Sequence, residues 1–124
     1  SKMVHLIRDP RDVITSFMEQ RWCPDDFEGA LKMYKSIITR WFSVEDSLTE
    51  GYCKMVKLEG LVLSPEETIR EICCFSGIPF DSNLLDIDLS KSNSDRWKKT
   101  FTNQNNKDIE KELSHVFERL NYDL

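Results

Sequence analysis

The chain has 124 residues, of which 40% are hydrophobic and 31% are charged. This composition is typical of a single globular domain and excludes a disordered chain. The 22 acidic residues outnumber the 17 basic ones, so the formal net charge is −5. Non-specific nucleic-acid binding needs many cationic contacts to phosphates, and we therefore expect no nucleic-acid partner. A site for a single phosphate needs only one or two well-placed cations and stays open.

The cysteines and glycines exclude two common kinds of site. There are four cysteines without a C-x-x-C pair and only two histidines, so we predict no metal site. We expect mostly buried, free thiols at Cys23, Cys53, Cys73 and Cys74. The four glycines stand at positions 29, 51, 60 and 77, and this spacing fits neither G-x-x-x-x-G-K-[ST] nor G-x-G-x-x-G. A glycine-rich phosphate loop is therefore absent from these residues.

The first half of the chain predicts a strand, two helices and a second strand. Residues 2–7 form a short apolar run rich in β formers, and Asp9 with Pro10 is typical of a helix start. We expect that helix to continue to about Trp22, with Asp12 as the acid of its first turn. Apolar residues then recur at helical spacing over 27–48, and residues 52–58 predict a second strand.

The second half predicts two helices separated by a long loop. Ser64 and Pro65, followed by Glu67, indicate an N-cap, a first helical position and a capping-box acid. Gly77 ends this helix, residues 81–104 read as a surface loop, and residues 105–120 predict a last amphipathic helix.

This order of elements indicates an α/β fold with parallel strands and helical crossovers. Two strands are few for a parallel sheet that is buried on both faces. The chain also begins with Ser1 rather than methionine. We therefore expect an excerpt from the back portion of a larger α/β domain, or a chain that gains strands by pairing with another chain.

The strongest candidate site lies where the first strand ends. Arg8 ends the strand and leads at once into the helix start, where unsatisfied N–H groups and the positive end of the helix dipole favour an anion. Arg8 can add a planar fork matched to phosphate oxygens, and the Ser16 hydroxyl can add a further donor. The same pattern also fits a simple capped helix, in which Arg8 pairs with Asp9 or Asp12 and Ser16 binds nothing.

Three segments resemble the sulfotransferases that use 3′-phosphoadenosine 5′-phosphosulfate (PAPS). In that family a strand-terminal arginine and a serine eight residues later hold the 3′-phosphate, and Arg8 and Ser16 match them within Met3–Ser16. Val56–Pro79 is similar to the family's second landmark, a strand followed by a proline-initiated helix and a Phe-Leu-Gly ending. Arg96–Asp123 is similar to its terminal Trp-(Lys/Arg) segment and closing Leu-Gly-Tyr helix. The three landmarks follow in the family's order and cover nearly the whole chain.

The resemblance implies part of a P-loop-type three-layer α/β/α fold, with residues 1–124 as a single domain or fragment from the C-terminal part of a sulfotransferase domain. It implies PAPS as cofactor and 3′-phosphoadenosine 5′-phosphate (PAP) as product, bound by Arg8, Ser16 and Lys91. Lys91 is the one match to the family's Arg-Lys-Gly segment. The intact protein would transfer a sulfuryl group to a hydroxyl or amine of an acceptor substrate. The family's 5′-phosphosulfate loop and catalytic base precede this segment, so we expect no catalytic residue here and an inactive isolated chain.

The chain also departs from the family pattern. Leu58 stands where many members have a tyrosine near the adenine, and Gly60 replaces an aspartate. A second interpretation is a non-catalytic α/β module that binds a missing N-terminal half or another chain, and a third is a nucleotide-kinase fragment. The sequence leaves the acceptor and the compartment (cytoplasm or Golgi lumen) open.

Overall fold

The computed structural model of the chain describes residues 2–86 and 95–124. The chain forms two compact units, each made of two stretches that are distant in sequence. Unit 1 contains Ser1–Arg8 and Asp46–Ser92, and unit 2 contains Asp9–Glu45 and Asn93–Leu124. The backbone therefore passes out of unit 1 directly after the first strand and re-enters it near the end of a long helix.

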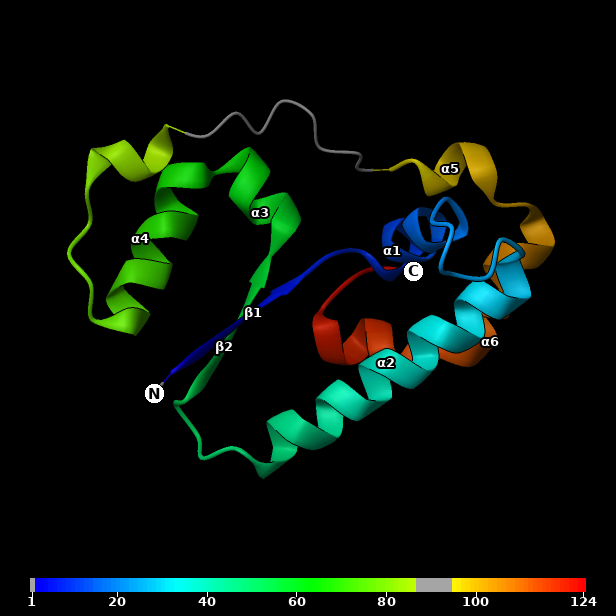
Figure 1. The fold of residues 1–124 in the computed structure, drawn as a ribbon, viewed down its shortest axis with the longest axis horizontal. Coiled ribbons are helices and arrows are strands. Elements are labelled where there is room, and N and C mark those ends of the chain that lie inside the picture. Colours follow the sequence, from blue (N-terminus) through cyan, green and yellow to red (C-terminus); the bar gives the residue numbers. More distant parts are fainter. Residues whose placement is uncertain (1, 87–94) are drawn as a thin grey trace. The chain divides into compact units, whose positions relative to one another are not determined.

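Unit 1 contains a pair of parallel strands, β1 (Met3–Ile7) and β2 (Cys53–Lys57), which Figure 1 shows side by side. Parallel strands cannot be joined by a tight turn and need a crossover. Here the helices α1 (Pro10–Met18) and α2 (Phe27–Ser47) lie between the strands in sequence and supply it. The predicted α/β class, with parallel strands and a helical crossover, is confirmed.

After β2, the described part of unit 1 contains three helical elements, and the first of them follows β2 without a loop. These elements are α3 (Leu58–Leu63), α4 (Pro65–Ser76) and the 3₁₀ helix η1 (Ser82–Leu85). The predicted start of α4 is confirmed, although the N-cap Ser64 makes no side-chain cap hydrogen bond. α4 ends at Gly77, whose φ of 71° is the left-handed conformation that favours glycine. The sequence analysis places no helix between the second strand and Ser64, and α3 occupies this stretch.

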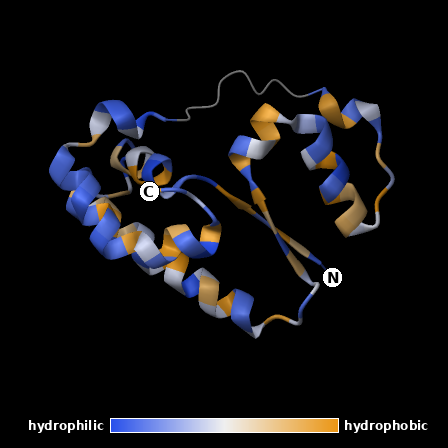
Figure 2. Cartoon of the chain, turned by 180° about the vertical axis from the view of Figure 1, so that it is seen from behind, coloured by the Kyte–Doolittle hydropathy of each residue, from blue (hydrophilic) through white to orange (hydrophobic). Residues whose placement is uncertain are grey.

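Unit 2 is a helical assembly built around one apolar core. It contains α1, nearly all of α2, and the helices α5 (Trp97–Thr100) and α6 (Asn103–Leu120). Figure 2 shows apolar and polar residues alternating along its helices, as expected when one side of each helix is buried. The buried apolar residues of α1, α2 and α6 are Ile14, Ala30, Leu31, Tyr34, Ile38, Phe42, Ile109, Leu113, Val116, Phe117 and Leu120.

The boundaries of the helices in unit 2 differ in places from the prediction. α1 ends at Met18 rather than near Trp22, and Trp22 is 72% exposed. α6 begins two residues before the predicted position, because Thr102 and Asn105 form a reciprocal capping box. Part of the predicted loop over residues 81–104 folds as η1 and α5. In the described part of the chain, no helix combines the length and apolar character needed to cross a membrane.

Candidate functional site

The carboxyl end of the parallel strand pair in unit 1 positions Arg8, one of the three predicted ligands. The register pairs Ile7 with Lys57, and the next residues along the two strands are Arg8 and Leu58. Both side chains are half-buried, and Leu58 is also the first residue of α3. In open α/β sheets, ligands bind outside the carboxyl ends of the strands. Arg8 therefore occupies the position in unit 1 where the fold class binds its ligands.

The start of α1 is built as the sequence predicts. Asp9 is the N-cap, and its Oδ1 accepts a 2.9 Å hydrogen bond from the backbone N–H of Arg11. The carbonyl of Asp9 accepts from the N–H groups of Asp12 and Val13 at 3.0 and 3.1 Å. Pro10 occupies the first helical position, where its missing N–H costs nothing. The positive end of the α1 dipole therefore lies directly after Arg8 in the chain.

The other two predicted ligands lie in different settings. Ser16 is half-buried on α1, one helical turn beyond Asp12 on the same side of the helix. Its neighbour Thr15 faces the interior, with 2% exposure and a 2.8 Å hydrogen bond from its hydroxyl to the Arg11 carbonyl. Arg8 closes unit 1, whereas Ser16 belongs to unit 2. Lys91 lies outside the described residues.

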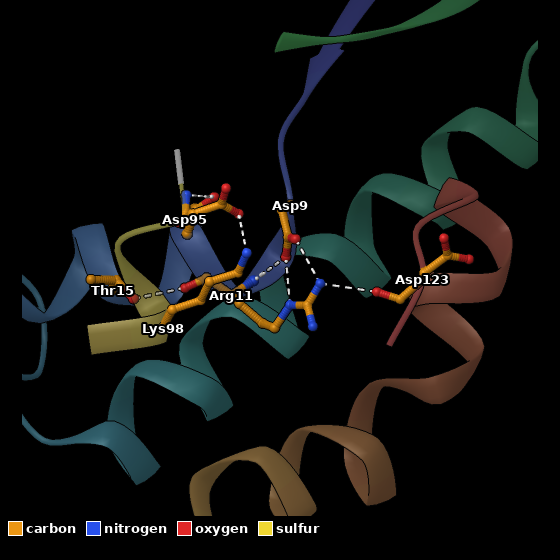
Figure 3. A network of polar contacts seen from close by, with 7 residues as sticks. Asp9, Arg11, Thr15, Asp95, Lys98 and Asp123 are labelled. Atoms are coloured by element: carbon orange, nitrogen blue, oxygen red, sulfur yellow. Dashed lines mark hydrogen bonds and ion pairs between the residues drawn. The ribbon is translucent and has the colours of Figure 1, made fainter. Parts of the chain in front are cut away.

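A second arginine of the same segment, Arg11, makes contacts that the sequence analysis missed. Its Nε and Nη2 donate to the two carboxylate oxygens of Asp9 at 3.0 and 2.8 Å. Nη2 also donates to the backbone carbonyl of Asp123 at 2.9 Å, as Figure 3 shows. The side chains of Arg11 and Asp9 are only 13% and 12% exposed. The sequence did contain a signal for these contacts, because two arginines and two acids lie within Arg8–Asp12.

α1 is also connected to the segment that precedes α5. Oδ2 of Asp12 accepts a 3.1 Å hydrogen bond from the backbone N–H of Asp95, and Asp12 is 2% exposed. Asp95 has a left-handed backbone with φ of 65°. Directly after α1, its C-cap residue Glu19 forms an ion pair with Arg96. Asp12 is therefore more than the first-turn acid that the sequence predicts.

The end of β1 and the start of α1 offer groups that can bind an anion. His5 lies within β1, as predicted, and His115 is exposed on α6. In residues 2–86 and 95–124, no group of three or more histidine, cysteine, aspartate and glutamate side chains gathers to hold a metal ion. The donors that the site does offer, a guanidinium and a helix start, suit an anionic oxygen ligand.

Comparison with solved structures shows the fold of a sulfotransferase. The whole chain aligns with the structure described as "Sulfotransferase Domain from the Curacin Biosynthetic Pathway", with a TM-score of 0.79 and 20% sequence identity. The alignment covers 54% of that structure, so the chain spans about half its length. The sequence profile described as "Sulfotransferase family" matches residues 1–82, about two thirds of the chain. The chain therefore belongs to the sulfotransferase family. A search of curated proteins gave no match.

Proposed function

We propose that this chain is the part of a PAPS-dependent sulfotransferase that binds the 3′-phosphate of the nucleotide. In this proposal the chain is the C-terminal portion of the domain, and Arg8, Ser16 and Lys91 are the phosphate ligands. The observation that carries the proposal is the position of Arg8, which stands at the carboxyl end of β1 and immediately before the capped start of α1. An arginine fork and a helix start together supply directed hydrogen-bond donors and positive potential to one anion.

The donor set fits a nucleotide phosphate better than a metal ion or a neutral ligand. The carboxylate of Asp9, the residue that follows Arg8, would repel a phosphate if its charge were uncompensated. Both of its oxygens accept hydrogen bonds from Arg11, so its charge is compensated locally. The site can therefore bind an anion despite the net charge of −5 of the whole chain.

In the intact protein, the bound nucleotide supplies the sulfuryl group on its 5′-phosphosulfate. Transfer of this group to an acceptor hydroxyl or amine would release PAP and a proton. Arg8 and Ser16 bind the opposite end of the nucleotide from the reacting sulfur. Their contribution is cofactor affinity and the discrimination of a 3′-phosphorylated nucleotide from ATP, and the chemical step depends on residues outside this chain.

Calorimetric titration with PAP tests this proposal, with adenosine 5′-phosphate as the comparison ligand. It is run on the chain of 124 residues and on any longer natural form of the protein, after circular dichroism has shown that each is folded. A charged hydrogen bond contributes about 1.5 to 3 kcal/mol, so Arg8→Ala should weaken PAP binding roughly 10- to 150-fold. Ser16→Ala removes a neutral donor and should weaken it roughly 2- to 12-fold. Arg40→Ala, which removes an exposed arginine from α2, is the control for lost positive charge.

Comparison of PAP with adenosine 5′-phosphate decides whether the proposal holds. Binding that needs the 3′-phosphate and is lost in Arg8→Ala, but not in Arg40→Ala, supports the proposal. Equal affinity for PAP and adenosine 5′-phosphate, or an Arg8→Ala variant with unchanged affinity for PAP, would overturn it. A variant with normal cofactor affinity and lost turnover would also contradict it, because Arg8 is assigned to binding alone.

A non-catalytic module that binds a partner protein is the second candidate, and one observation favours it. β1 exposes several apolar side chains, with Val4 40% and Leu6 53% exposed. Such side chains on a short strand pair are typical of a surface that another polypeptide covers. A folded protein that binds no nucleotide in any natural form, but forms a stable complex through β1, would favour this candidate.

A further inference from the structure

Arg11 joins three parts of unit 2 that are far apart in the sequence. Its guanidinium donates to the carboxylate of Asp9, the N-cap residue of α1, and to the backbone carbonyl of Asp123 near the end of the chain. The same guanidinium lies over the indole ring of Trp97, 4.0 Å from its centroid. The ring of Phe117 on α6 is a second aromatic neighbour, at 5.1 Å. Figure 3 shows the polar part of this arrangement, with Arg11 between Asp9 and Asp123.

The hydrogen-bond donors of Arg11 contact protein groups, so we do not assign Arg11 as a ligand of the phosphate. Two of its nitrogen atoms donate to Asp9, and one of these also donates to Asp123. A guanidinium between two aromatic rings gains cation–π attraction, and the side chain is only 13% exposed. Arg11 therefore has a structural role in unit 2, which differs from the role proposed for Arg8.

The charge of Asp9 gives Arg11 a consequence for anion binding. Asp9 follows Arg8 directly and is nearly buried, so an uncompensated carboxylate there would act through little screening water. It would lower the positive potential at the start of α1 and weaken the attraction for phosphate. Arg11 compensates this charge with a two-pronged contact, the strongest geometry between an arginine and a carboxylate.

We propose that Arg11 is a positioning residue of the nucleotide site, which binds no phosphate itself but neutralises Asp9 and fixes the first turn of α1 against Trp97 and the chain end. The inference rests on the proposed function for its effect on nucleotide binding. Its effect on the first turn of α1 is independent of that function and is measured separately.

The test combines three variants with PAP titration. Arg11→Ala should weaken PAP binding about tenfold, because Asp9 loses the cation that pairs with both of its oxygens. Asp9→Asn in the same chain should restore most of that affinity, since asparagine removes the charge and remains a good N-cap. Arg11→Lys keeps a positive charge beside Asp9 and should lose less affinity than Arg11→Ala; it also serves as the informative variant if Arg11→Ala does not fold.

The pattern across the variants distinguishes a positioning residue from a ligand. If Arg11 bound phosphate directly, the double variant would bind PAP as weakly as Arg11→Ala, and the inference would be overturned. Unchanged PAP affinity in Arg11→Ala, with normal 3′-phosphate preference in the parent, would also overturn it and leave the proposed function standing.

Amide hydrogen exchange supplies the readout that needs no ligand. The N–H of Val13 donates to the Asp9 carbonyl in the first turn of α1, at 3.1 Å. Arg11→Ala should speed its exchange about tenfold or more relative to the exposed control Arg40→Ala. If the parent shows no 3′-phosphate preference, the proposed function fails, and this exchange rate alone decides the role of Arg11. Exchange at Val13 that equals the parent's would then overturn the inference as well.

Discussion

The carboxylate of Asp12 on α1 accepts a hydrogen bond from the backbone N–H of Asp95, a residue 83 positions later in the chain. The oxygen to nitrogen distance is 3.1 Å, and Asp12 is 2% exposed. The hydrogen bond lies in a partly buried setting, where it is stronger than the same bond would be in water. Asp12 therefore contributes to the stability of unit 2 by satisfying a backbone group outside its own helix.

Removal of the Asp12 carboxylate should destabilise unit 2. We expect Asp12→Ala to lower the free energy of unfolding by about 1 to 3 kcal/mol, and Asp12→Asn to lower it less because an acceptor oxygen is retained. All three tryptophans, at positions 22, 41 and 97, belong to unit 2, so urea unfolding followed by tryptophan fluorescence measures this change. Asp25→Ala, at an exposed position, is the control. Equal unfolding midpoints for Asp12→Ala and Asp25→Ala would contradict the prediction.

The ion pair between α2 and α6 should make stability depend on acid pH. Lys35 donates a 2.7 Å hydrogen bond to Glu112, and this bond, with the charge of Lys35, lowers the pKa of Glu112. A carboxyl whose pKa is lower in the folded state stabilises the fold above its unfolded pKa, near 4.3, and loses this contribution as the pH falls.

We therefore expect Glu112→Gln to flatten the acid limb of the stability curve between about pH 3 and pH 5, as measured by urea midpoints. The effect should be small because both side chains are about 40% exposed. Glu28→Gln removes one partner of the exposed Glu28–Lys32 pair on α2 and is the matched control. An acid limb that stays unchanged in Glu112→Gln would contradict the assignment.

The buried phenol of Tyr34 should produce the opposite dependence at alkaline pH. Burial raises the pKa of Tyr34, and the negative charge of Asp9 raises it further. Because the folded state then binds the proton more tightly than the unfolded state, stability falls as the pH rises above about 10. Tyr34→Phe should reduce this alkaline loss, whereas Tyr52→Phe, at a residue 47% exposed in unit 1, should not. Thermal unfolding between about pH 8 and pH 11 measures both variants.

The core of unit 2 predicts a large effect at one position of α1. Ile14 is completely buried, so truncation leaves a cavity as well as losing transfer free energy. Ile14→Ala should lower the free energy of unfolding by about 2 to 5 kcal/mol. Ile37→Ala on α2 makes the same chemical change at a position 47% exposed and should stay within about 0.5 kcal/mol of the parent. Similar losses in the two variants would show that Ile14 is not a core position.

The sequence was sufficient for the elements that local chemistry determines. The strand end at Arg8, the N-cap at Asp9 and the proline start of α1 were predicted and are confirmed. The end of α4 at Gly77 is confirmed for the same reason, since only a few residues tolerate its left-handed backbone. Boundaries were missed where the local signal is weak: α3 has six residues and contains a glycine, and the α6 capping box uses Asn105 instead of glutamate or glutamine.

Contacts between distant residues were beyond the sequence analysis. No periodicity or cap signal links Asp12 with Asp95, or Arg11 with Asp123, because the partners are 83 and 112 positions apart. Arg11 also has several acids nearby in sequence, and only the fold selects Asp9 as its partner. The assignment of Arg8, Ser16 and Lys91 as phosphate ligands depends on the family resemblance and stays a prediction.

Unit 2 is built from two stretches of sequence, and this affects the order in which the two units can fold during synthesis. Its core needs α6, so α1 and α2 leave the ribosome more than fifty residues before their packing partner exists. During that interval the ring of Phe42 on α2 lacks Arg119 of α6, which lies over it in the folded chain. Unit 1 is complete by Ser92 and can fold earlier during translation. Nascent chains stalled before α6 should therefore be strong clients of holding chaperones, and release of α6 should end that dependence.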